Sequence, residues 1–318
     1  MRRFSVVILL FYAIFAVAGC GTGPAAGEET ATVVDPSEIK YYPHDFIRDP
    51  YGEDAPPGGF NDDWQISIVN DAGDELRRLS EVELFSLPSE QDFYFAYVYS
   101  TINNWPTARF YAAEGYSVTG FLRALGLADA VMAITFRAED GYEITLTREQ
   151  LFSEQYYFPQ VGEDAGGAEP VFPMIAYRWR EGTDNLDEIR DDKPIFIFGQ
   201  RNPFEHTNPA FVVGVSEIVV SSYVPEAWQE ANTFPEPGFI EAGETVKLQH
   251  TYFGLVKLYY TLDGSDPTMF STLYNPSTYQ QELNRPIPIT EPTTIKVLVI
   301  GYGRRDSEIA VFEFWPEE

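Results

Sequence analysis

The stretch YYTLDGSDPT at residues 259–268 decides the fold of the C-terminal part of this chain. Its first half is rich in residues that favour a strand, and its second half places Asp-Gly before Asp-Pro, which favours a tight turn. Gly264 accepts positive φ, Pro267 fixes φ, and Asp263 and Asp266 can accept backbone N–H groups of the turn. We therefore predict that these four residues form a structural turn.

Two chemical alternatives for the aspartates fit the sequence less well. Carboxylates that hydrolyse a glycosidic bond face each other across a cleft, whereas Asp263 and Asp266 belong to one short turn. A calcium loop needs more oxygen ligands, more widely spaced, than this turn provides. We therefore assign no catalytic residue and no metal ligand to it.

The segments around the turn alternate apolar and polar residues or run apolar, and they show no helical period. This pattern predicts a small all-β sandwich over residues 237–318. We expect its strands at residues 245–249, 256–262, 294–300 and 309–314.

The same region resembles a known family. The quoted stretch is followed by Ser271, Tyr274, the segment TTIKV at residues 293–297 and Ser307. Together these residues strongly resemble the chitobiase and β-hexosaminidase C-terminal domain over residues 237–316. The resemblance implies an immunoglobulin-like sandwich that is an accessory domain, in some cases suspected of carbohydrate contact, and not a catalytic unit.

Residues 64–222 combine strand and helix signals, which predicts a mixed α+β domain. Apolar residues at i, i+3, i+4 and i+7 share one helix face between Ser117 as N-cap and Gly126 as terminator. Thr147 and Gln150 have the spacing of a capping box for a second, short helix. We expect strands at residues 64–68, 93–99, 131–136, 142–146, 171–178, 195–198 and 211–220.

The order and spacing of these elements are similar to the oxidoreductase molybdopterin-binding domain of the sulfite oxidase type. The similarity rests on the strand at residues 92–99, GYSVTGFLRALGL at 115–127, AEDGY at 138–142 and LTREQL at 146–151. In that family a cysteine thiolate just after the corresponding strand binds molybdenum, and Ser100 stands at this position. Because a hydroxyl does not replace a soft thiolate ligand, we predict a degenerate domain with no metal and no cofactor.

Other residues do not restore such a site. Arg109, Arg178 and Arg201 have the chemistry to hold a pterin phosphate, but in so acidic a domain we expect them in salt bridges. The three histidines are scattered over the chain, which excludes a histidine cluster: His44, His206 and His250. The residues that would bind a cofactor therefore remain unknown.

The amino terminus predicts export and lipidation. Arg2 and Arg3 precede an uncharged apolar run over residues 4–17, which is shorter than the roughly 20 residues of a spanning helix. The following Cys20 is the only cysteine, and VAGC at residues 17–20 resembles the lipobox of bacterial lipoproteins. We expect residues 1–19 to be a signal peptide and Cys20 to carry the lipid. A lone cysteine also excludes a disulfide framework.

Composition predicts the connecting segments of the chain and excludes some classes of partner. Residues 20–63 are rich in Gly, Pro, Ala, Thr and acids and predict a lipidated flexible tether, and residues 223–236 predict a linker. The formal charge of −28 repels phosphate backbones, which excludes nucleic acid as a partner. Aromatic residues make up 15% of the chain, too many for a disordered acidic polymer.

Some aromatic residues have the chemistry of a sugar-stacking platform, although packing in the core and between sheets is the explanation that we favour. They are Trp105, Tyr156, Tyr157, Phe158, Trp179, Tyr259 and Tyr260.

Together these patterns predict a lipid-anchored, extracytoplasmic binding or structural protein of the bacterial envelope. Its expected partners are the membrane, through the lipid on Cys20, and a cell-wall glycan or an envelope protein. Two enzyme alternatives stay open, namely a divergent oxidoreductase that retains a pterin and a carbohydrate-active enzyme. A purely structural envelope component is the third alternative.

Overall fold

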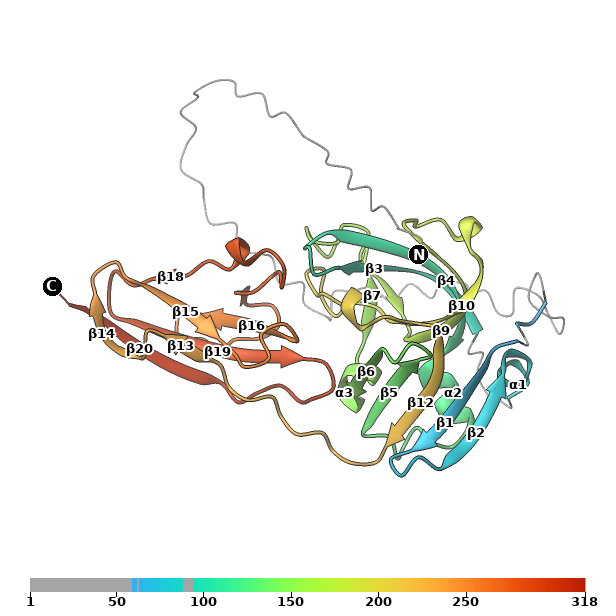
Figure 1. Ribbon diagram of the computed structural model, residues 1–318. Coiled ribbons are helices and arrows are strands. Elements are labelled where there is room, and N and C mark those ends of the chain that lie inside the picture. Colours follow the sequence, from blue (N-terminus) through green and yellow to red (C-terminus); the bar gives the residue numbers. More distant parts are fainter. Residues whose placement is uncertain (1–58, 62, 88–93, 318) are drawn as a thin grey trace, which may run out of the picture. The chain divides into compact units, whose positions relative to one another are not determined.

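The computed structural model describes residues 59–61, 63–87 and 94–317 (Figure 1). The predicted signal peptide, Cys20 and most of the predicted tether lie outside the described residues. Within these residues there are two main hydrophobic cores, one drawn from residues 66–220 and one from residues 228–314.

The first core lies in a domain built from two five-stranded sheets, with strand orders β2-β1-β12-β5-β6 and β11-β10-β9-β4-β3. The first sheet contains β1 (Gln65–Asn70), β2 (Glu75–Ser80), β5 (Ala133–Ala138), β6 (Glu143–Thr147) and β12 (Val215–Ser221). The second contains β3 (Tyr94–Ile102), β4 (Ala108–Ser117), β9 (Met174–Glu181), β10 (Arg190–Ile197) and β11 (Val212–Val213). A further pair is formed by β7 (Gln155–Tyr157) and β8 (Glu169–Val171).

The two sheets share one core because apolar side chains from both meet between them. The rings of Phe136 in β5 and Phe196 in β10 stack with their centroids 3.5 Å apart, and both side chains are fully buried. Tyr99, Tyr116 and Tyr177 of the second sheet are also fully buried, so the core is largely aromatic.

The helices are short and begin at the expected caps. They are α1 (Glu81–Phe85), α2 (Val118–Ala124) and α3 (Arg148–Phe152). Ser117 accepts the N–H of Gly120 at the start of α2, and the Thr147–Gln150 capping box precedes α3. None of the helices in the described part of the chain is long and apolar enough to cross a membrane.

The first domain therefore contains far more strand than the expected α+β mixture. Three short helices accompany ten strands of the two large sheets. Two of these strands, β2 and β4, were not expected from the sequence. They lie in the sheets as neighbours of β1 and β3, and the β3–β4 pair runs as a long hairpin in Figure 1.

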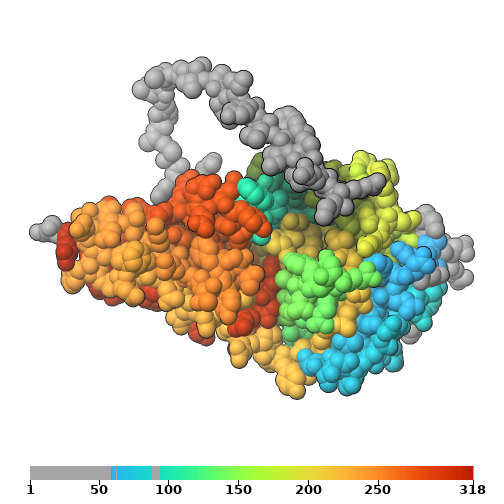
Figure 2. Space-filling model, in the orientation of Figure 1, coloured from blue at the N-terminus to red at the C-terminus, as the bar shows by residue number. Residues whose placement is uncertain are grey.

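The second core lies between two sheets of a sandwich, as the C-terminal sequence predicts. Its sheets have the orders β14-β20-β19-β16-β17 and β13-β15-β18, and their residues appear orange to red in Figure 2. Val246, Leu258, Val297 and Phe314 fill its centre with almost no exposed surface. The strands are β13 (Asn232–Phe234), β14 (Gly238–Glu241), β15 (Thr245–Gln249), β16 (Val256–Thr261), β17 (Thr272–Leu273), β18 (Ile287–Pro288), β19 (Thr293–Gly301) and β20 (Ala310–Glu317).

A buried ion pair joins the two sheets of the first domain. The Arg178 guanidinium in β9 lies 2.8 Å from the carboxylate of Glu81, which follows β2, and both side chains are almost fully buried. Arg178 also donates to the Gly59 carbonyl at 2.6 Å and to the Tyr94 hydroxyl at 3.2 Å. The backbone N–H of Asn61 donates to Glu81 at 2.6 Å. Each buried charge is therefore hydrogen-bonded as well as paired.

Removing one charge of this pair is expected to be costly. We predict that Arg178→Ala lowers the free energy of unfolding by about 3–5 kcal/mol, because the Glu81 carboxylate stays buried without its cation. Urea denaturation followed by tryptophan fluorescence measures this loss.

The matched control is Arg78→Ala, which breaks an exposed pair with Glu75 and should leave the free energy of unfolding almost unchanged, because solvent screens that pair. Equal losses in the two variants would contradict the structural role of the buried pair.

Candidate functional site

Ser100, the residue at the position of the expected metal-binding cysteine, is completely buried in β3. Its hydroxyl donates to Gln200 Oε1 at 2.6 Å and accepts the backbone N–H of Phe158 at 2.8 Å. Gln200 is equally buried, and its Nε2 donates to the Glu205 carbonyl at 2.7 Å. The Ser100 hydroxyl therefore links β3 to the chain segments around Phe158 and Gln200 through hydrogen bonds inside the core.

These residues do not fit a molybdenum cofactor. The side chain at position 100 offers a hydroxyl in place of a thiolate, and its hydrogen-bonding capacity is used inside the protein. Among the described residues, no group of three or more His, Cys, Asp or Glu side chains is arranged to hold a metal ion.

Two of the three arginines considered for a pterin phosphate are in ion pairs. Besides Glu81, Arg178 contacts Asp191 through Nε at 3.1 Å. Arg201 lies 2.5 Å from Glu205, and the Glu205 side chain is almost fully buried. The third arginine, Arg109, has no ion-pair partner within the described ranges and instead lines a cavity.

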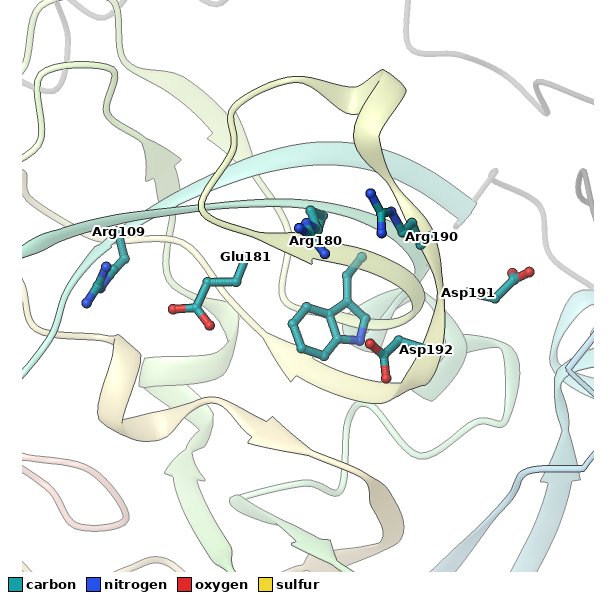
Figure 3. A pocket seen from close by; sticks show the side chains of 7 residues that line it. Arg109, Arg180, Glu181, Arg190, Asp191 and Asp192 are labelled. Carbon is teal, nitrogen blue, oxygen red and sulfur yellow. The ribbon is translucent and has the colours of Figure 1, made fainter. Parts of the chain in front are cut away.

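This cavity has a volume of about 540 Å³, within the range of small-ligand pockets. Side chains of β4, β9, β10 and their ends line it, and Figure 3 shows how six of them lie. Arg109 and Glu181 occupy one side of the view, and Arg190 and Asp192 the other. The lining residues are Arg109, Trp179, Arg180, Glu181, Arg190, Asp191 and Asp192.

Trp179 provides the apolar wall of the cavity. Its indole N–H donates to the Lys193 carbonyl at 2.9 Å, and its ring lies 6.3 Å from the ring of Tyr111 at a tilt of 36°. The side chain is half-buried, so one part of the ring is fixed by packing and another faces the cavity.

The other aromatic residues considered as a platform divide between core and surface. Tyr156, Phe158 and Tyr259 are buried. Trp105 and Tyr279 stack at 5.3 Å and 12°, with 56% and 64% of their surface exposed. Trp105 thus contacts another exposed ring and not the cavity.

The turn at 263–267 is held by hydrogen bonds of Asp263. Asp263 accepts the backbone N–H of Ser265 at 2.9 Å and the Ser265 hydroxyl at 2.6 Å, and Gly264 has a φ of 84°. Asp266 differs from the expectation, because it pairs with Lys296 at 2.7 Å where a backbone N–H was expected. Within the described residues both carboxylates are used inside the domain.

The histidines are not brought together. Burial and the charge of Lys257 lower the pKa of His206 to about 3, so this imidazole is neutral at neutral pH. His250 accepts the N–H of Tyr252 and contacts the Gln229 carbonyl through its two ring nitrogens. His44 lies outside the described residues.

Comparison with known proteins supports the C-terminal assignment. Residues 235–311 match the family profile of the chitobiase/beta-hexosaminidase C-terminal domain. The C-terminal β-sandwich is of this type. No curated protein sequence matches the chain. A marsupial T cell receptor chain shares 9% identity over 72% of both chains, with a TM-score of 0.16, which carries no argument about the fold.

The arginine cavity itself was not predicted from the sequence. Arg109 was considered only for a phosphate, and Trp179 only as a member of an aromatic platform. The RWRE segment at residues 178–181 is no signal for the site, because neighbours in a strand point to opposite faces and Arg178 is buried with Glu81.

The closed network around Ser100 yields a direct test. We predict that Ser100→Ala lowers the free energy of unfolding by about 1–3 kcal/mol, because the Phe158 N–H and the Gln200 Oε1 lose their partner inside the core. Chemical denaturation measures the loss.

Ser222→Ala is the matched control, because Ser222 is exposed and the change should stay within about 0.5 kcal/mol. An unchanged stability of Ser100→Ala would show that position 100 is not part of a closed network.

Proposed function

We propose that this chain is a lipid-anchored, extracytoplasmic protein of the bacterial envelope that binds carbohydrate without cleaving it. The observation that carries the proposal is the match of residues 235–311 to a domain named after carbohydrate-active enzymes, chitobiase and β-hexosaminidase. That match covers only the sandwich, so the ligand and the role of the first domain belong to the proposal.

The first domain is proposed to be a metal-free relative of the molybdopterin-binding domain. The buried and hydrogen-bonded state of Ser100 supports the metal-free part of this proposal, because the hydroxyl is not available to a metal ion. In the same domain, the cavity beside Trp179 offers a surface on which the apolar face of a sugar ring can pack.

Binding without cleavage is directly measurable. We expect the full chain in detergent micelles to be retained on a panel of immobilised envelope glycans, and we expect no new reducing ends from soluble forms of those glycans. Retention on none of them would contradict carbohydrate binding. Release of reducing ends would instead favour the carbohydrate-active enzyme.

Lipid anchoring is a separate proposal that rests on the VAGC segment at residues 17–20. We expect the chain expressed in bacteria to incorporate a labelled fatty acid and to sediment with membranes, and Cys20→Ser to do neither. The neighbouring change Thr22→Ala serves as control and should keep the label. A labelled Cys20→Ser variant would refute the assignment.

A further inference from the structure

The arginines of the cavity stand out because none of them forms an ion pair with a residue in the described part of the chain. Arg109, Arg180 and Arg190 are exposed and make no ion pair or side-chain hydrogen bond within the described ranges. The chain has 49 acidic residues against 21 basic ones, so carboxylates are abundant as partners. Three guanidinium groups nevertheless line one cavity and remain available to a ligand.

The carboxylates that share the cavity are already engaged. Asp191 pairs with Arg178, and its side chain points away from the other labelled groups in Figure 3. Asp192 accepts the backbone N–H of Lys193 at 2.7 Å. Glu181 lies opposite Tyr111 in the β4–β9 pair, and burial raises the pKa of Tyr111, with the nearby Glu181 charge raising it further. These three carboxylates keep their negative charge and balance the formal charge of the three arginines, but among the described residues none of them forms an ion pair with Arg109, Arg180 or Arg190.

The pairing of strands sets the spacing of these groups. Arg190 lies opposite Trp179 in the β9–β10 pair, and Tyr111 lies opposite Glu181 in the β4–β9 pair. Arg109 precedes Tyr111 by two residues on β4, which places it on the same face of the sheet. Arg109 and Arg190 therefore lie on the same face of the sheet as the half-buried indole of Trp179, whereas Arg180, the next residue along β9, is on the opposite face.

We propose that this cavity binds a saccharide bearing an oxyanion, a carboxylate or a phosphate. The guanidinium fork matches such oxyanions with two parallel hydrogen bonds, and the indole face packs against the apolar face of the sugar ring. The strongly negative charge of the whole chain repels dense polyanions such as nucleic acids, which restricts the site to ligands with few charges. This inference rests on the proposed carbohydrate binding and specifies its ligand.

Calorimetric titration of the full chain in detergent micelles tests the inference. The probes are disaccharides ending in glucuronate or galacturonate, their methyl esters, a disaccharide phosphate, and inorganic phosphate alone. We expect the acidic disaccharides to bind and the methyl esters to bind at least about tenfold more weakly, since esterification removes the charge. A higher affinity for the uronate or for the sugar phosphate identifies which oxyanion the site takes. If inorganic phosphate binds as tightly as the acidic sugars, the sugar ring does not contribute to binding, and the proposal that the ligand is a saccharide is wrong.

Arginine variants locate the site. We expect Arg109→Gln, Arg180→Gln and Arg190→Gln each to weaken binding about tenfold, and Trp179→Leu to weaken binding of the sugar but not of inorganic phosphate. Arg285→Gln is the matched control, because Arg285 is also exposed and has no ion-pair partner among the described residues. Since the three arginines are exposed, circular dichroism should show all three variants folded.

The outcomes separate this inference from the proposed function. If neutral glycans bind and acidic ones do not, or if binding is unaffected by all three arginine variants, the anionic site is wrong while carbohydrate binding stands. If no glycan binds at all, both fail.

Discussion

The Arg178 guanidinium is the constraint on which the first domain depends. It is a buried charge, so it requires a charged and hydrogen-bonded partner, and Glu81 provides one from the other sheet. The pair thereby fixes how β9 lies against the segment that follows β2. The Nε of Arg178 also contacts Asp191, so one carboxylate that lines the neighbouring cavity is paired with this buried cation. A structural ion pair thus sets the electrostatics of the surface beside it.

Ser100 and the arginine cavity differ in what their polar side chains contact. At Ser100 the polar groups satisfy one another inside the core, and the hydroxyl is part of the packing. At the cavity the arginines make no ion pair with a described residue, although Glu181, Asp191 and Asp192 line it as well. Because one fold can host different functions, the cavity and not the architecture points to a function.

The sequence allowed prediction of elements whose signal is local. Strands β15, β16, β19 and β20 alternate or run apolar, and the caps Ser117 and Thr147 mark where helices begin. Strand β4 escaped prediction because ARFYAAEGYS is buried on both faces over most of its length and so lacks alternation. A Cβ at Gly115 would overlap the Ile175 carbonyl, so this glycine permits the approach of β9, a long-range requirement with no local signature.

The cavity could not be predicted from the sequence for a related reason. Arg109 and Trp179 are distant in the chain and share one face of a sheet only because β4 pairs with β9. Likewise, only the structure shows that Asp191 and Asp192 are engaged elsewhere, since the sequence shows the acids without their partners. Local sequence patterns predicted individual strands and helix starts, whereas strand pairing determines which residues line the cavity.

Hydrogen exchange of the full chain, with and without a glucuronate-terminated disaccharide, tests the central claim most directly, because it reports which backbone segments the ligand protects. The account predicts slower exchange at residues 109–111 and 178–192, around Trp179 and its arginines, with little change at Ser100. Protection confined to the sandwich, residues 235–311, would contradict it and would place carbohydrate binding in the accessory domain alone.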